Sequence, residues 1–155
     1  MEVKVKKSKP LRMAYVKYTG AYDKIPYDQY FGELFTWTKE KRLKPAGPPM
    51  GIFYDDPKTV PAEKCRSEVG IPIRGRAKPE KKIKIKEIPS TDVAAIAHRG
   101  PTKDYSKTYE KLNRWVAENG YVATGPPMEI YLSKPKLVRG EPSIFSVIQV
   151  PVKKA

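Results

Sequence analysis

The stretch Gly47-Pro48-Pro49-Met50 occurs a second time as Gly125-Pro126-Pro127-Met128, 78 residues further along the chain. Other matched pairs flank it at spacings of 78 to 80 residues: Trp37 and Trp115, Tyr18-Thr19-Gly20 and His98-Arg99-Gly100, Ile71-Pro72-Ile73 and Val150-Pro151-Val152. An ordered series of matches over this length indicates a tandem repeat rather than chance. The two copies span residues 2–73 and 82–152.

Both copies predict the same elements in the same order, a short leading strand followed by a β-α-β-β series. β-branched and aromatic residues mark the strands, an apolar stripe at helical spacing marks the helices, and Gly and Pro mark the turns. The expected strands are residues 2–7, 11–18, 50–55 and 65–73 in the first copy and 82–88, 92–99, 128–132 and 144–152 in the second; the expected helices are 24–43 and 103–119.

Two such copies predict an α+β fold, in which an antiparallel sheet carries two helices on one face. The length of 155 residues fits a single domain, residues 1–155. Ligand sites favour the seams between modules, so we expect a ligand cleft between the copies.

The composition excludes several kinds of site. Cys65 is the only cysteine and His98 the only histidine, so an internal disulfide, a cysteine-based zinc site and a two-histidine metal site are all excluded. No G-x-S-x-G motif accompanies His98. We therefore expect neither a metal nor a cofactor.

The chain shows no sign of membrane insertion or export. It has no apolar run of about 18 residues, and its first residues lack the apolar core of a signal peptide. We expect a cytoplasmic protein without a membrane partner.

The net charge of +14 requires an explanation. Lysines are spread along the whole chain, and in Lys82–Lys86 they alternate with isoleucine, as on a half-buried strand. This pattern favours a solvated basic surface over a nucleic-acid contact, and it leaves an acidic partner as a further alternative.

Glu129 is the most informative residue. In the expected strand 128–132, alternation puts Met128, Ile130 and Leu132 on one face and Glu129 with Tyr131 on the other. We expect the first face to meet the helices and the second to face the cleft. The first copy has Gly51 at the position of Glu129, so only one copy offers a carboxylate. A solvent-facing glutamate is the alternative.

Aromatic residues are plentiful near the expected seam. Together with Glu129, Tyr131 and Gly51, the candidate ligand-binding residues are Phe53, Trp37, Tyr18 and Tyr22. Aromatic rings around a carboxylate bind cations through their faces and through charge. A packing role is the alternative for Trp37, because Trp115 occupies the matching helix position.

Three other residues favour structural explanations. His98 takes the place of Tyr18 at the end of a strand, Glu68 follows Arg66 at the spacing of a same-face ion pair, and Cys65 suits a small buried position. A role for Glu68 as a second carboxylate in the cleft stays open.

Two segments carry a resemblance to a known family. Gly51–Pro57 followed by Pro61–Arg66 resembles the first copy of the GyrI-like family, and Gly125–Leu132 resembles its second copy. The resemblance covers nearly the whole chain. It implies a duplicated fold with a cleft, and it implies that Glu129 lies at the base of that cleft and engages cationic or electrophilic aromatic ligands.

The resemblance implies three kinds of function. The first is binding of hydrophobic aromatic or cationic small molecules, which we favour for a stand-alone member of the family. The second is hydrolysis of cyclopropane-bearing DNA-alkylating compounds, with Glu129 as the catalytic general base and a tyrosine as proton donor. The third is inhibition of DNA gyrase. The net charge of +14 adds binding to another protein or to nucleic acid as a further alternative.

Overall fold

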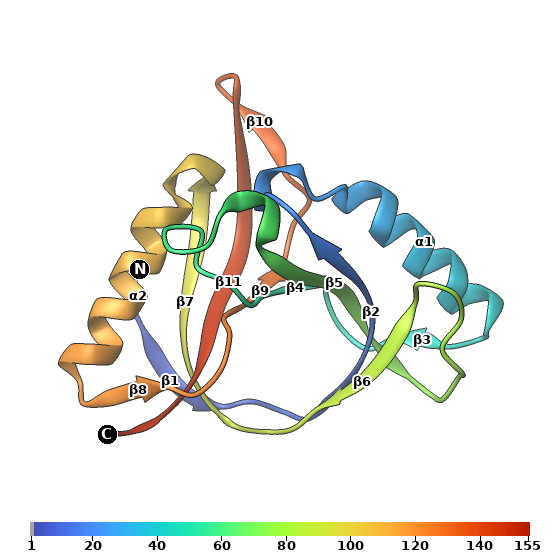
Figure 1. The fold of residues 1–155 in the computed structure, drawn as a ribbon, viewed down its shortest axis with the longest axis horizontal. Coiled ribbons are helices and arrows are strands. Elements are labelled where there is room, and N and C mark those ends of the chain that lie inside the picture. Colours follow the sequence, from blue (N-terminus) through green and yellow to red (C-terminus); the bar gives the residue numbers. More distant parts are fainter. Residues whose placement is uncertain (1) are drawn as a thin grey trace. The chain divides into compact units, whose positions relative to one another are not determined.

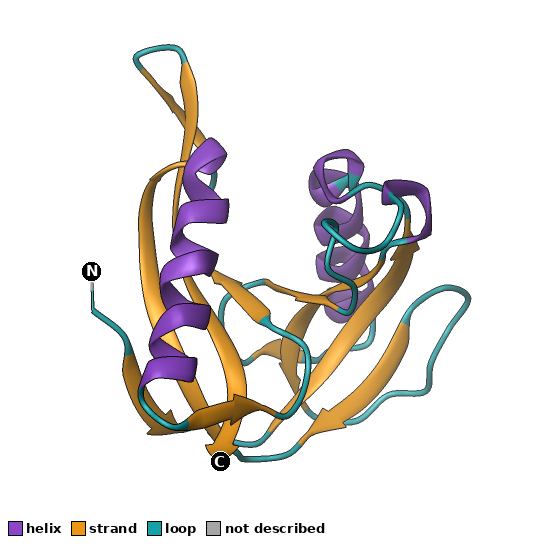
Figure 2. Ribbon diagram, turned by 60° about the vertical axis from the view of Figure 1, so that its left-hand side comes forward, coloured by secondary structure: helices purple, strands orange, loops and turns teal. Residues whose placement is uncertain are grey.

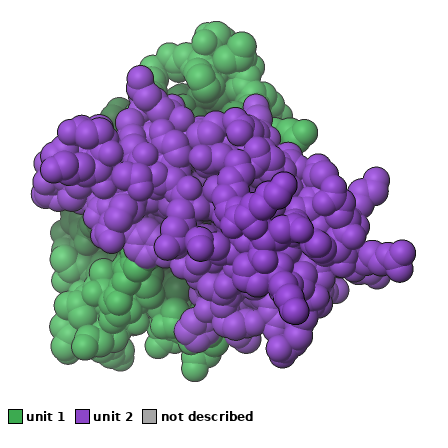
Figure 3. All heavy atoms as spheres, turned by 45° about the vertical axis from the view of Figure 1, so that its right-hand side comes forward, with its two compact units in different colours: residues 1–9, 90–155 green, residues 10–89 purple. Residues whose placement is uncertain are grey.

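The computed structural model of the protein describes residues 2–155. The chain forms two compact units, which Figure 3 colours separately. Unit 1 combines the amino-terminal segment that ends at Lys9 with Ser90–Ala155, and unit 2 is Pro10–Pro89. Each unit is an antiparallel sheet with one long helix (Figure 1).

Unit 2 contains a four-stranded sheet in the order β4-β5-β2-β6, with β3 paired to β5. Its elements are β2 (Leu11–Thr19), η1 (Tyr22–Lys24), α1 (Tyr27–Glu40), β3 (Lys44–Pro45), β4 (Met50–Phe53), η2 (Ala62–Lys64), β5 (Arg66–Arg74) and β6 (Lys84–Ile88).

Unit 1 repeats this arrangement in the order β9-β11-β7-β1, with β8 and β10 paired to β11. Its elements are β1 (Lys4–Lys7), β7 (Asp92–Pro101), η3 (Thr102–Asp104), α2 (Tyr105–Glu118), β8 (Tyr121–Ala123), β9 (Met128–Tyr131), β10 (Lys136–Val138) and β11 (Glu141–Lys154). The α+β class and the antiparallel sheets are confirmed, while an origin by duplication stays a hypothesis.

The leading strands are exchanged between the two sequence repeats. β1 belongs to the first repeat but pairs with β7, and β6 belongs to the second repeat but pairs with β2. The boundaries of the compact units therefore fall near residues 9 and 89, between the leading strand and the rest of each repeat. Sequence periodicity shows which segments correspond, but it does not show which partner an edge strand selects.

Both helices are shorter than expected at their amino-terminal ends. Ile25 precedes Pro26 and has extended backbone angles, because the proline ring disfavours helical angles in the residue before it. α1 therefore begins at Tyr27, after the separate turn η1. The three short strands β3, β8 and β10 were not predicted, since their few residues carry no readable alternation.

Each helix covers one face of the sheet in its own unit, as Figure 2 shows for α2. In unit 2 the buried core consists of Ala14, Val16, Leu34, Trp37, Ile71, Ile73 and Ile83. In unit 1 it consists of Ala94, Ile96, Leu112, Val116, Ile148, Val150 and Val152. Alternate residues of the central strands thus point toward the helix, as the period of two requires.

Gly70 shows how closely the strands of unit 2 approach one another. A Cβ atom at this position would lie 2.6 Å from the backbone oxygen of Ala14 and 2.4 Å from Cε of Met13. Because the first contact is with backbone, the central strand β5 requires glycine here.

Within residues 2–155, no helix is both long and apolar enough to cross a lipid bilayer.

Candidate functional site

The helix-facing surface of unit 1 becomes polar near the amino-terminal end of α2. Leu112 and Val116 of the helix pack on Ile148 and Val150 of β11. One and two helical turns before Leu112, the helix presents Tyr109 and Tyr105. At the same level the sheet presents the polar side chains of Glu129, Tyr131, Ser146 and His98. The candidate site is this polar end of the core.

Glu129 lies at the centre of the site. It sits in β9 opposite Ile148, and its side chain is buried, with a relative exposure of 8% for the residue. The hydroxyl of Tyr109 donates to Oε2 at 2.5 Å, and the hydroxyl of Tyr131 donates to Oε1 at 2.9 Å. Burial raises the pKa of Glu129, although the two hydrogen bonds act in the opposite direction.

The expected orientation of β9 is wrong. Glu129 and Tyr131 lie on the helix-facing side, because Glu129 is paired with the core residue Ile148 and accepts a hydrogen bond from Tyr109 of α2. Sequence alternation separates the two faces of a strand but does not say which face the helix covers. The carboxylate therefore sits beside a helix and is held by it.

Two further groups complete the polar end. Tyr105 and Ser146 share a hydrogen bond of 2.8 Å, and burial, followed by the negative charge of Glu129, raises the pKa of Tyr105 to about 12. His98 lies in ring contact with Tyr105, its Nδ1 is 2.7 Å from the hydroxyl of Thr108, and its Nε2 donates to the carbonyl of Pro101. Both nitrogens of His98 are thus used by the scaffold.

The matching region of unit 2 is aromatic instead of acidic. Phe53 corresponds to Tyr131 and packs with Ile25 and Val69, while Tyr18 and Tyr22 line the same cluster. The rings of Tyr22 and Phe53 lie edge to face, with centroids 4.9 Å apart. The hydroxyl of Tyr22 donates to the carbonyl of Asp55 at 2.8 Å. Three of the sequence candidates therefore lie together.

The remaining candidates of unit 2 have different surroundings. Gly51 is buried in β4 opposite Val69, the position that matches Glu129 in β9. Trp37 lies in the hydrophobic core with a relative exposure of 3%. Its indole Nε1 has no hydrogen-bond partner within the described chain. Trp37 packs α1 against the sheet of unit 2, and it is not part of the candidate site.

A second buried carboxylate lies in unit 2. Glu68 accepts hydrogen bonds from the hydroxyl of Tyr54 at 2.7 Å and from the ammonium of Lys86. The ammonium also lies 4.6 Å from the ring centroid of Tyr15. The predicted pairing of Glu68 with Arg66 is wrong, because Arg66 pairs with Asp55. Glu68 already has its own cation, whereas no Lys or Arg is paired with Glu129 among the interactions of the described residues.

Sequence reasoning missed Tyr109 and Ser146, and it left Tyr105 out of the candidate ligand-binding residues. The signal for the two tyrosines was present, because they continue the apolar stripe of Leu112 and Val116 toward the helix start. A tyrosine in such a stripe buries its ring and requires a partner for its hydroxyl. Ser146 lies in an alternating strand and carries no comparable signal.

The family described as "GyrI-like small molecule binding domain" matches residues 1–153. The chain belongs to this family.

Among residues 2–155, no group of three or more His, Cys, Asp or Glu side chains is placed to hold a metal ion.

Two relatives of this GyrI-like chain are named DNA gyrase inhibitor. The protein of Erwinia billingiae is 30% identical over 109 residues, which cover 66% of this chain and 68% of the relative. The protein of Escherichia fergusonii is 25% identical over 138 residues, which cover 86% and 88%.

Solved structures show the same fold. The EcmrR chain in a complex with DNA has a TM-score of 0.83 at 19% identity, with 99% of this chain covered. This GyrI-like chain spans only 58% of that EcmrR chain, but it spans 98% of the separate EcmrR C-terminal domain, at a TM-score of 0.76. At this identity the likeness concerns the fold alone.

Proposed function

We propose that this GyrI-like protein binds hydrophobic aromatic cations, and that Glu129 is the group that recognises their charge. The observation that carries the proposal is a buried carboxylate whose two oxygens accept hydrogen bonds from tyrosines while no lysine or arginine is paired with it in the described residues. A buried anion without a counter-ion is costly, and an entering cation removes that cost.

The surrounding rings supply the second part of the recognition. Tyr109, Tyr131 and Tyr105 surround the carboxylate, and an aromatic face attracts a cation with about 0.5–2 kcal/mol. Phe53, Tyr18 and Tyr22 form a separate aromatic cluster in unit 2. The expected cleft between the copies stays a prediction.

The same carboxylate is less well suited to catalysis. Each of its oxygens already accepts a hydrogen bond from a tyrosine, and these two bonds oppose the rise in pKa that burial causes. Hydrolysis with Glu129 as general base would require one tyrosine to turn away so that a water molecule could reach the carboxylate. The arrangement of these side chains therefore favours binding over hydrolysis.

Titration with two ions of one shape tests the proposal. Tetraphenylphosphonium and tetraphenylborate have nearly the same size but opposite charge. The net charge of +14 favours the borate everywhere on the surface, so tighter binding of the phosphonium must come from a local anion. We expect calorimetry at physiological salt to give the phosphonium an affinity at least about tenfold higher. Equal or weaker binding of the phosphonium would contradict the proposal.

A second proposal is inhibition of DNA gyrase, which the names of two relatives favour. We expect the purified protein to reduce supercoiling of a relaxed plasmid by gyrase in a concentration-dependent way. Because a protein of charge +14 also coats DNA, relaxation of the supercoiled form of the same plasmid by topoisomerase I serves as the control. Equal inhibition of both enzymes would indicate DNA coating and would exclude a specific effect on gyrase.

A further inference from the structure

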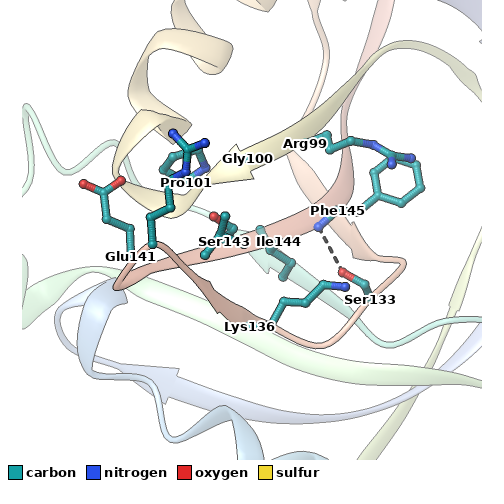
Figure 4. A pocket seen from close by; sticks show the side chains of 11 residues that line it. Arg99, Gly100, Pro101, Ser133, Lys136, Glu141, Ser143, Ile144 and Phe145 are labelled. Carbon is teal, nitrogen blue, oxygen red and sulfur yellow. Dashed lines mark hydrogen bonds between the residues drawn. The ribbon is translucent and has the colours of Figure 1, made fainter.

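A hollow lies beside the hairpin of β10 and β11 in unit 1, apart from Glu129. Its volume is about 640 Å³, and Figure 4 shows it from close by. The lining combines the cations Arg99, Lys136 and Arg139 with apolar Val138, Ile144 and Phe145. The hairpin projects past the amino-terminal end of α2 in Figures 1 and 2.

A second hollow of about 270 Å³ shares the lining residues Arg99 and Pro101 with the first. Lys107 and Lys111 add two more cations there. The two acidic lining residues are each in an ion pair, Glu141 with Lys103 at 2.7 Å and Asp104 with Lys107 at 3.7 Å. The lining therefore contains five cations and two paired acids, and its net charge is positive.

The side chains of the first hollow are held in place. The Arg99 guanidinium lies 4.1 Å from the ring centroid of Phe145, and the Phe145 amide donates to the hydroxyl of Ser133 at 3.0 Å. Figure 4 shows the Lys136 side chain extending toward Ser133. Stacking on a ring leaves the guanidinium edge available for a carboxylate.

Arg139 is fixed by the turn that it forms. Val138 pairs with Glu141, so Arg139 and Gly140 make a two-residue hairpin loop, with φ angles of 53° and 80°. Two positive φ angles define the type I′ turn, in which asparagine followed by glycine is preferred. An arginine at this position is conformationally unfavourable.

Apolar side chains on the same hairpin are open to solvent. Leu137 is 73% exposed and Val138 is 49% exposed, and Leu132 in the loop before β10 is 43% exposed. Contact with a nucleic-acid backbone would not bury these side chains, whereas protein interfaces combine arginine with apolar residues.

We propose that this hairpin surface binds an acidic, partly apolar segment of a partner protein. Carboxylates of the segment pair with Arg99, Lys136 and Arg139, while its apolar side chains cover Leu137 and Val138. His98 lines the second hollow, but Glu129 and its hydrogen-bond partners Tyr109 and Tyr131 line neither, so the hairpin surface does not include the carboxylate of the proposed small-molecule site.

The experiment measures anisotropy of a short fluorescein-labelled peptide of alternating Glu and Leu on the full chain. We expect it to bind more tightly than the same peptide with Gln in place of Glu. The test variant is Lys136→Gln with Arg139→Asn, in which asparagine removes the charge and suits the turn. We expect about tenfold weaker binding, because two charge pairs of about 0.7 kcal/mol each are lost.

The control variant, Lys153→Gln with Lys154→Gln, makes the same change in charge at exposed positions of β11. We expect it, and separately Glu129→Gln, to retain the affinity for the peptide within about twofold. Equal losses in the test and control variants, or equal binding of the two peptides, would overturn the proposal. The proposal would also be overturned if a short DNA duplex bound more tightly than the acidic peptide and the test variant lost this binding. That result would indicate a nucleic-acid surface.

Discussion

Glu129→Gln is expected to weaken the binding of tetraphenylphosphonium between about tenfold and a hundredfold. The substitution keeps the size of the side chain and a partner for the hydroxyls of Tyr109 and Tyr131, but it removes the negative charge. A charge-assisted contact in a buried site is worth about 1.5–3 kcal/mol, which corresponds to this range. Calorimetry with the purified variant measures the loss.

The affinity of the wild-type protein should also depend on pH. Since burial raises the pKa of Glu129, the carboxylate takes up a proton at a higher pH than an ordinary glutamate, whose pKa is 4.5. We expect the affinity for the phosphonium to fall as the pH is lowered through this raised pKa, and the Glu129→Gln variant to show no such fall.

As the pH is lowered, the contribution of Glu129 to the stability of the ligand-free protein increases, whereas the affinity for the phosphonium decreases. A carboxyl group with a raised pKa binds its proton more tightly in the folded state than in the unfolded state. Its contribution to stability is therefore fully present below the ordinary pKa and is lost as the pH rises through the raised value. At neutral pH the Glu129→Gln variant should unfold at a higher temperature, as expected of a binding residue that costs stability.

Glu118→Gln is the matched control for the loss of charge. Glu118 is exposed at the carboxyl-terminal end of α2 in the same unit, so the variant has the same net charge as Glu129→Gln. We expect its affinity for the phosphonium to change by less than about twofold. The site assignment is wrong if both variants lose affinity equally.

The sequence was sufficient to predict the scaffold but not the orientation of its faces. Repeated glycines, prolines and alternating strands located eight strands and two helices, because these patterns reflect local backbone preferences. The exchange of β1 and β6 and the helix-facing position of Glu129 depend on which edge or face is covered. That choice is made by tertiary packing, which a local pattern does not contain.

The candidate site was predicted in part. Glu129 and Tyr131 were found from strand alternation and from the resemblance to a family, and they share a hydrogen bond. Tyr109 comes from a helix 20 residues away, and no spacing rule connects it to Glu129. Glu68 was paired with the wrong cation because Lys86 lies 18 residues further along the chain, on a strand that reaches it only in the folded unit.

Lys86→Met is expected to destabilise unit 2 by about 2–3 kcal/mol. The side chain of Glu68 is 7% exposed and that of Lys86 is 28% exposed. Breaking a fully buried ion pair costs about 3–5 kcal/mol, and the partial exposure of Lys86 reduces this cost. The variant also loses the contact with the ring of Tyr15, 4.6 Å from the ammonium. Urea denaturation measures the change in the free energy of unfolding.

Two further variants separate the ion pair from other effects of the substitution. Lys84→Met changes an exposed lysine two residues earlier on β6, on the same side of the strand, and should cost less than about 0.5 kcal/mol. The double variant Glu68→Gln with Lys86→Met should recover more than half of the loss, because no buried charge is left without a partner. Burial by itself lowers the pKa of Lys86. The hydrogen bonds to Glu68 and Tyr54 have the larger combined effect, so the pKa of Lys86 is raised. If Lys86→Met costs no more than Lys84→Met, the carboxylate of Glu68 does not depend on this lysine, and it would then be a second unpaired anion of the kind that we assign to Glu129.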